Sequence, residues 1–454
     1  MELNSDAALA TDLYELTMAA AYFENKIKAE GTFELFVRHY PNNRSYLIAA
    51  GLQQAVDYLL QLKFENKHID FLRQHPIFKD VSEDFFQYLK TFRFNGNVWA
   101  MPEGTVFFTN EPILRISAPI IEAQIVETYL LSIINFETLI ASKAARVVAS
   151  ARGRGVVEFG ARRAHGPESA LLAARASYIG GCIGTSNVLA GYKFGIPTYG
   201  TVAHSFVMTF DSEREAFERF CNVFPSNPAF LLDTYDTLEA AKVVVSMPVR
   251  PSIVRLDSGN RAVLSRKVRK ILDNSGRRYT KIFVSGDLNE YVLDRLTKQK
   301  APIDFFGVGT ELVTSRDDPA LPGIYKLVAL EQDGQTTFRA KTSKGKRTIP
   351  AAKQVYRQHT PRGKIQRDLI ALRDEPPPRG MKPLLIEVIH NGQLIMSLPN
   401  LKEIRHHTKS EIDSLPYRFR RLHGSVKPPV RLSRQLERLT NSLWKNELIK
   451  RHSQ

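Results

Sequence analysis

The stretch that decides the fold is residues 252–310, SIVRLDSGNRAVLSRKVRKILDNSGRRYTKIFVSGDLNEYVLDRLTKQKAPIDFFGVGT. It contains three apolar runs of strand length, SIVRL, KIFV and IDFF. Residues 260–274, which follow the first run, are long enough for a crossover helix. Each run ends in polar, charged or glycine residues, which is typical of a strand that leads into a loop. The stretch therefore predicts βα units with parallel strands.

The same alternation continues towards the amino terminus. Three further runs, VVEF, IPTY and AFLL, precede this stretch, and residues 237–245 have the length of another crossover helix. The six runs lead into GARRAHG, GTVAHS, DTYD, DSGN, SGDLNE and GVGTEL. Loops are polar in most proteins, but in α/β barrels the loops at the carboxyl ends of the strands build the active site. Six such loops favour a catalytic domain, built as a barrel or a doubly wound sheet.

The flanking segments mix helices with strands. Helical spacing covers residues 12–23, 48–62 and 120–151, and residues 32–38 alternate like a strand. Beyond residue 322, short strands over residues 325–331 and 336–342 lead to a proline-containing stretch at residues 374–379 and a final helix over residues 433–450. We expect an N-terminal α+β domain over residues 1–118, completed by part of residues 330–440, a barrel over residues 119–325, and a basic C-terminal region over residues 326–454.

Composition limits the class of protein and its partners. The 454 residues are 43% apolar, enough for a large core, and neither a signal peptide nor a membrane span is expected. Two cysteines, Cys182 and Cys221, favour a reducing cytoplasm. The net charge is +16, and the whole excess lies between Lys341 and Gln454. This region can bind nucleic acid or surround phosphate-rich small substrates, but no nucleic-acid-binding motif accompanies it.

Three strand-end loops carry residue types that bind anions or metal. Arg162 in GARRAHG suits bidentate recognition of phosphate or carboxylate, although neighbouring arginines are usually solvated or paired. Gly309 and Thr310 in GVGT can cradle a phosphate or form only a turn. Asp287 in SGDLNE supplies a carboxylate of the kind that Mg²⁺ prefers.

Two further loops have two interpretations each. In RLDSGN, Arg255 and Asp257 leave a strand on the same face, where they either pair with each other or grip a ligand with an anionic end and hydroxyl groups. His204 in GTVAHS has no second histidine at metal spacing. A lone histidine is usually structural, but its nitrogen can also accept a phosphoryl group.

Six segments, in this order, resemble the nicotinate phosphoribosyltransferase family: TDLYELTMAAAYF, FELFVRHYP, EFGARRAHGPESA, SYIGGCIGTSNVLAGYKFGIPTYGTVAHSF, VRLDSGN and FFGVGTELVTS. The resemblance implies an enzyme of NAD biosynthesis that couples phosphoribosyl transfer to nicotinate with ATP hydrolysis and uses Mg²⁺. It implies an irregular α/β barrel of the type II phosphoribosyltransferase kind beside a second α+β domain built from the N- and C-terminal segments. It also implies a cytoplasmic homodimer whose chains complete each other's active sites.

The resemblance assigns a role to each candidate residue. Phe159 and Tyr14 of the partner subunit would stack on the pyridine ring, and Arg255 with Thr201 would bind the nicotinate carboxylate. Phosphate oxygens would be held by four residues: Arg162, Gly309, Thr310 and Arg38 of the partner subunit. Asp257 would meet the ribose hydroxyls, His204 would be the phosphohistidine, and Asp287 is the candidate metal ligand.

Three positions bear on this resemblance. Many members of the family read DSGD where this chain has Asn260 in DSGN, and the partner-facing lysines, Lys326 or Lys344, lie where the match is weak. Nicotinamide-using relatives have an aspartate at the position of Ser186, which would repel a carboxylate, so Ser186 favours nicotinate. The alternatives are a nicotinamide-preferring enzyme on the same fold and a non-catalytic protein that binds nucleic acid through its basic C-terminal region.

Overall fold

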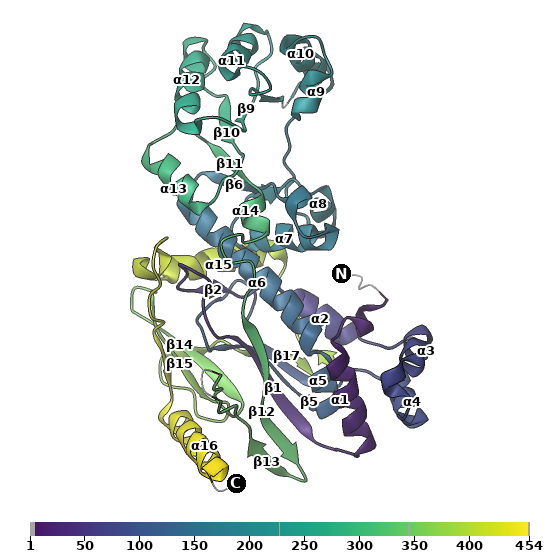
Figure 1. The fold of residues 1–454 in the computed structure, drawn as a ribbon. Helices are drawn as coiled ribbons and strands as arrows, with labels where there is room; N and C mark the ends of the chain where they lie inside the picture. Colours follow the sequence, from purple (N-terminus) through teal and green to yellow (C-terminus); the bar gives the residue numbers. More distant parts are fainter. Residues whose placement is uncertain (1–4, 227, 344–345, 453–454) are drawn as a thin grey trace. The chain divides into compact units, whose positions relative to one another are not determined.

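The computed structural model describes residues 5–226, 228–343 and 346–452, which form two compact units (Figure 1). The first unit combines Met1–Thr138 with Ala320–Gln454, and the second is Leu139–Pro319. The sequence predicts boundaries at residues 119 and 325 instead. The Thr138 hydroxyl bonds to the backbone of Ala50 at 3.3 Å. The first half of the long helix that contains Thr138 therefore belongs to the first unit. No helix in the described ranges is long and apolar enough to cross a membrane.

The second unit is built on a parallel six-stranded sheet in the order β7-β6-β11-β10-β9-β8. Its strands are β6 (Gly155–Glu158), β7 (Gly184–Thr185), β8 (Ala229–Leu231), β9 (Ile253–Leu256), β10 (Lys281–Val284) and β11 (Phe305–Val308). Val254, Ile282 and Phe306, from three neighbouring strands, are fully buried in one apolar core. The parallel βα architecture predicted from residues 252–310 is confirmed.

The prediction of a strand at IPTY is wrong. Thr198 forms only an isolated parallel bridge with Thr185, which lies in the short strand β7. Pro197 precedes Thr198 and has no N–H to donate to a ladder. In the part of the chain that the structure describes, no bridge joins this segment to β8, so the hydrogen-bonded sheet stays open there. The barrel is accordingly irregular.

Helices alternate with these strands, and α12 packs on β9 and β10 (Figure 1). They are α7 (Pro167–Ile179), α8 (Val188–Phe194), α9 (His204–Met208), α10 (Glu213–Val223), α11 (Thr237–Ser246), α12 (Arg261–Asn274), α13 (Glu290–Lys298) and α14 (Thr310–Val313). Asp236 caps α11 by accepting the N–H groups of Leu238 and Glu239, each at 2.9 Å. Asn260 caps α12 through the N–H of Val263. Both crossover helices predicted from sequence are confirmed.

The first unit joins the two ends of the chain in one sheet. Strand β1 (Glu30–Val37) lies between β5 (Pro112–Pro119) and β12 (Gly323–Gln332), antiparallel to both. The sheet continues through β13 (Gln335–Phe338), β3 (Asn97–Ala100), β17 (Ile386–His390) and β18 (Gln393–Leu394). A second sheet contains β14 (Lys353–His359), β15 (Ile365–Leu372), β16 (Met381–Pro383) and β19 (Val430–Leu432), and β2 (Leu47–Ile48) pairs with β4 (Val106–Phe107).

The helix predicted over residues 120–151 is two helices, α5 (Ile120–Ile125) and α6 (Glu127–Ser150). The break is associated with a contact from a distant part of the chain, because the N–H of Thr128 donates to the Glu15 carboxylate instead of to a carbonyl one turn back. The other helices of the first unit are α1 (Leu13–Glu24), α2 (Leu52–Gln61), α3 (Asn66–Gln74), α4 (Glu83–Thr91), α15 (Leu401–Ser414) and α16 (Arg434–His452).

Candidate active site

The Phe159 ring and the Arg255 guanidinium group lie together at the strand ends of the second unit. Phe159 directly follows β6, and the Arg255 guanidinium carbon lies 5.5 Å from the centre of its ring. Arg255 donates to Thr201 Oγ1 at 3.0 Å, to Ser285 Oγ at 2.8 Å and to Asp257 Oδ1 at 2.7 Å. A guanidinium group has five N–H donors, so two remain for the carboxylate of a ligand.

One face of the Phe159 ring packs against apolar residues. It stacks on Phe283 with ring centres 5.2 Å apart and 28° between the planes. Gly307 permits this packing, because a Cβ there would lie 2.8 Å from Phe159 Cδ2 and 2.7 Å from Phe283 Cε1. One face of Phe159 is thus fixed by the core.

Asp257 is ionised at neutral pH. Burial raises the pKa of its carboxyl, but hydrogen bonds from Ser285 and Arg255 and the charges of Arg255 and His204 outweigh burial, so the pKa lies below its ordinary value. Ser285 and Arg255 both donate to Oδ1. Oδ2 accepts no hydrogen bond from the described residues, which leaves it available to a ligand hydroxyl.

The loop that carries Asp257 is fixed by its neighbours. Asp233 Oδ2 accepts the Asp257 N–H at 3.0 Å and the Ser258 hydroxyl at 2.6 Å. Gly286, with φ of +82°, approaches so closely that a Cβ there would lie 1.9 Å from the Asp257 carbonyl oxygen. Any other residue at position 286 would push this loop away.

His204 is the first residue of α9 and is partly buried. Its Nδ1 lies 3.2 Å from Thr234 Oγ1, in the loop after β8. Its Nε2 has no hydrogen-bond partner in the described part of the chain. The contact with Thr234 therefore orients the ring through one nitrogen and leaves the other for chemistry.

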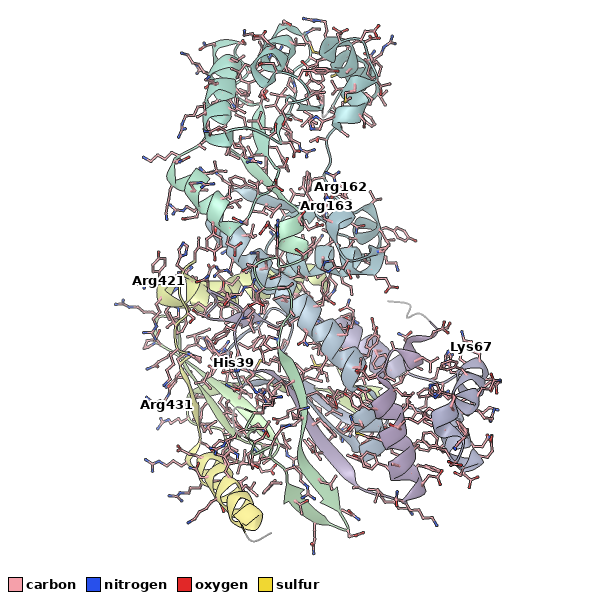
Figure 2. The ribbon with its side chains drawn as sticks, in the orientation of Figure 1. His39, Lys67, Arg162, Arg163, Arg421 and Arg431 are labelled. Atoms are coloured by element: carbon pink, nitrogen blue, oxygen red, sulfur yellow. The ribbon has the colours of Figure 1, made fainter. Side chains whose placement is uncertain are left out.

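The candidate phosphate-binding residues come from two neighbouring strands. The Phe159 N–H donates to the Val308 carbonyl at 2.8 Å, so the loop with Gly309 and Thr310 begins beside Phe159. Arg162 lies in the short helix η3 (Ala161–Arg163), next to Arg163 in Figure 2. Its exposed side chain contacts no acid in the described residues.

The candidate metal ligand Asp287 is exposed, has a left-handed backbone with φ of 45°, and makes no side-chain bond to any described residue. The described residues contain no group of three or more His, Cys, Asp or Glu placed to hold a metal. Protein Mg²⁺ sites commonly use one or two carboxylates together with substrate phosphates. The free Asp287 carboxylate fits this type of site, whereas Asn260 is occupied as a helix cap.

Tyr14 and Arg38 belong to the other unit, so their predicted roles remain predictions. Tyr14 lies in the first turn of α1 and is 47% exposed, and Arg38 directly follows β1. Lys326 Nζ lies 3.8 Å from a Glu127 carboxylate oxygen. Lys344 lies outside the described residues.

Glu15, beside Tyr14, anchors α1 to the start of α6. Its carboxylate is fully buried and accepts the Thr128 N–H at 3.0 Å, the Thr128 hydroxyl at 2.7 Å and the Thr11 hydroxyl. Burial raises the pKa of Glu15 to about 7, although these hydrogen bonds lower it in part.

Glu15→Gln should therefore stabilise the protein at high pH. Because the folded state holds a proton up to about pH 7, the contribution of Glu15 to stability is present below its ordinary pKa of 4.5 and is lost as the pH rises through 7. Glutamine keeps the acceptor for Thr128 and does not ionise. Urea unfolding between pH 4.5 and 8 should show that the free energy of unfolding of Glu15→Gln exceeds that of the wild type by an amount that grows with pH, to on the order of 3 kcal/mol. The exposed Glu83→Gln is the control, and parallel pH profiles for Glu15→Gln and the wild type would contradict the assignment.

Four supporting residues of the site are missing from the sequence prediction. Asp233 and Thr234 lie in the DTYD loop and Ser285 in the SGDLNE loop, and their place after a strand is the signal that could have found them. Glu158 gives no such signal, because it reads as part of an apolar run.

Comparison with known proteins defines the class first. Residues 9–135 match the model of the nicotinate phosphoribosyltransferase N-terminal domain, residues 140–317 that of the quinolinate phosphoribosyl transferase C-terminal domain, and residues 378–440 that of the nicotinate phosphoribosyltransferase C-terminal domain. The fold is that of a type II phosphoribosyltransferase. The structure of human nicotinic acid phosphoribosyltransferase is similar, with a TM-score of 0.85, 29% identity, and coverage of 95% of this chain and 99% of the human one.

The particular family follows from sequence relatives. Nicotinate phosphoribosyltransferase pncB2 of Mycobacterium tuberculosis is 45% identical over 92% of this chain and 89% of its own. The nicotinate phosphoribosyltransferase of Bacillus subtilis is 36% identical over 98% of this chain and 95% of its own. This chain belongs to the nicotinate phosphoribosyltransferase family and is an enzyme.

Proposed function

We propose that the chain transfers the phosphoribosyl group of phosphoribosyl pyrophosphate to nicotinate, giving nicotinate mononucleotide and pyrophosphate in NAD biosynthesis. The observation that carries the proposal is Arg255, which lies beside the Phe159 ring and is bonded to Thr201 and Asp257. A flat ring with a carboxylate suits this arrangement, with the ring on Phe159 and the carboxylate on the remaining Arg255 donors. Family membership supports the same substrates.

Nicotinate rather than nicotinamide is the proposed substrate. Ser186 lies directly after β7 and its N–H donates to the Glu158 carbonyl at 2.9 Å. The Ser186 side chain carries no charge, so it does not repel a carboxylate. Arg255 adds a positive charge, which binds a carboxylate more strongly than it binds a neutral amide.

Bond formation at the ribose uses the neighbouring loops. As the bond between C1 and pyrophosphate breaks, the pyridine nitrogen forms its bond to C1, and positive charge develops on the sugar. Asp257 would hold ribose hydroxyls with Oδ2 and stabilise that charge, while Gly309, Thr310 and Arg162 would hold phosphate oxygens. Asp287 would hold Mg²⁺, which would supply positive charge for the departing pyrophosphate.

ATP enters the proposal through His204. The γ-phosphoryl group would move from ATP to Nε2 with release of ADP, and water would later cleave the phosphohistidine to give phosphate. The contact between Nδ1 and Thr234 supports this assignment, since it leaves Nε2 as the free nucleophile.

A homodimer is part of the proposal, with Tyr14 of the partner subunit covering the pyridine ring and Arg38 of the partner subunit on phosphate. The exposed ring of Tyr14, in a unit separate from Phe159, supports it. The chain has only two cysteines, Cys182 and Cys221, and both are buried, which agrees with the cytoplasmic location that we propose.

The test is turnover of nicotinate or nicotinamide with phosphoribosyl pyrophosphate and Mg²⁺, with and without ATP. We expect turnover of nicotinate, stimulation by ATP, and little turnover of nicotinamide. Arg255→Ala should chiefly raise the KM for nicotinate, because a charged hydrogen bond contributes on the order of 1.5–3 kcal/mol. Equal use of nicotinamide, or an unchanged KM in the variant, would contradict the carboxylate site. DNA binding without turnover would favour the nucleic-acid alternative.

A further inference from the structure

Glu158, the last residue of β6, is a fully buried carboxylate directly before Phe159. One carboxylate oxygen, Oε1, accepts the N–H of Gly160. The other, Oε2, accepts the hydroxyl of Thr185 at 2.5 Å. No lysine, arginine or histidine among the described residues forms an ion pair with Glu158.

Burial of a carboxylate that has no cation partner costs free energy unless hydrogen bonds satisfy its oxygen atoms. Burial raises the pKa of Glu158, and the bonds from Thr185 and Gly160 only partly offset this. The two oxygens of the Glu158 carboxylate match two donors, the N–H of Gly160 in the loop after β6 and the hydroxyl of Thr185 in β7. An apolar side chain would leave the Gly160 N–H and the Thr185 hydroxyl unsatisfied in the interior.

The two donors belong to segments with proposed roles. Gly160 lies between Phe159 and η3, which carries Arg162. Thr185 precedes Ser186, and its hydroxyl also accepts the Asn187 N–H at 2.9 Å. The main chain strengthens the connection, because the Glu158 carbonyl accepts the Ser186 N–H at 2.9 Å.

We propose that Glu158 is a positioning residue that fixes the spacing between the Phe159 ring and Ser186, and thereby sets the affinity for nicotinate. It touches neither substrate nor reacting atoms, and it acts through Gly160 and Thr185. The proposal rests on the proposed function, because it takes Phe159 and Ser186 as the walls of the pyridine site. His204 lies in a different loop, so the ATP hydrolysis assigned to His204 serves as an internal reference.

The variants are Glu158→Gln, Thr185→Val and the double variant. Glutamine at position 158 has the same size but places an NH₂ group opposite one of the two donors, Gly160 N–H or Thr185 hydroxyl. Valine at position 185 removes only the Thr185 hydroxyl. The matched control for the carboxylate is Glu122→Gln, since Glu122 is also buried, has a raised pKa, and accepts only from Asn95. The matched control for the hydroxyl is Thr138→Val.

The first readout is hydrogen exchange of the ligand-free protein. Glu158→Gln and Thr185→Val should accelerate exchange in residues 160–163 and 185–187, and neither control should. Unchanged exchange in these segments would overturn the positioning role. This measurement needs no substrate, so it is independent of the proposed function.

The second readout is steady-state kinetics. We expect the KM for nicotinate to rise roughly tenfold in each single variant, with the ATP hydrolysis measured without nicotinate unchanged. The effects should be less than additive in the double variant, because both residues form one contact. An equal loss of ATP hydrolysis would indicate a merely structural role and overturn the proposal, as would an unchanged KM for nicotinate. Absence of nicotinate turnover in the wild type would instead be a failure of the proposed function.

Discussion

Replacement of His204 by alanine is expected to abolish ATP hydrolysis and the stimulation of synthesis by ATP, while slow ATP-independent synthesis persists. The reason lies in the division of labour within the site. Arg255 and Asp257 bond to each other and to Ser285 without using His204, so substrate binding and bond formation do not require its ring. Only the phosphoryl group from ATP would need Nε2.

The measurement combines release of phosphate from ATP with formation of nicotinate mononucleotide in the same sample. His390→Ala is a suitable control, because His390 is an exposed histidine that bonds only to Glu387. Thr234→Val should slow ATP hydrolysis without abolishing it, since it loosens the ring but keeps Nε2. ATP hydrolysis at the wild-type rate in His204→Ala would show that the phosphohistidine assignment is wrong.

Lys143→Met should destabilise the protein by about 3–5 kcal/mol, the usual effect of removing one partner from a buried ion pair. Lys143 Nζ lies 2.6 Å from Glu290 and 2.8 Å from Asp317, and the Lys143 and Glu290 side chains are 1% and 0% exposed. Arg146 adds a weaker contact with Glu290 at 3.2 Å. Without the lysine, two carboxylates lose their main cation inside the second unit.

Urea denaturation followed by circular dichroism measures this loss. Lys281→Met is the matched control, because Lys281 pairs with Asp304 at 3.1 Å while 53% of its side chain is exposed, and such pairs contribute about 0–1 kcal/mol. Adding Glu290→Gln to Lys143→Met should recover part of the stability, since it neutralises the unpaired charge. Equal effects of Lys143→Met and Lys281→Met would contradict the burial of this network.

The repeating part of the fold could be predicted from sequence because each element is local. Residues 260–274 carry their own cap, Asn260, and their own helical spacing, and α12 forms there. The break between α5 and α6 could not be predicted, since it depends on Glu15, more than a hundred residues earlier. The strand expected at IPTY fails for a similar reason, because its pairing depends on the short strand that contains Thr185.

The candidate site could be predicted where the residue type itself indicates a chemical role. Arg255, Asp257 and His204 stand out in or after apolar runs, and in the structure Arg255 and Asp257 bond to each other while His204 bonds to Thr234. Glu158 and Lys143 were not recognisable as partners, because the sequence shows only a charge inside an apolar stretch. What makes them important is burial and the donor or acceptor that faces them, and both are properties of the folded chain.

The position of β1 also has a consequence for the order in which the chain can fold as it is made. Strand β1 has both of its neighbours only after synthesis has passed Gln332, because β5 precedes the second unit and β12 follows it. The second unit is one continuous segment that ends at Pro319. All strands of the six-stranded parallel sheet are therefore synthesised before β12 is available. The sheet that contains β1 can be completed only after that.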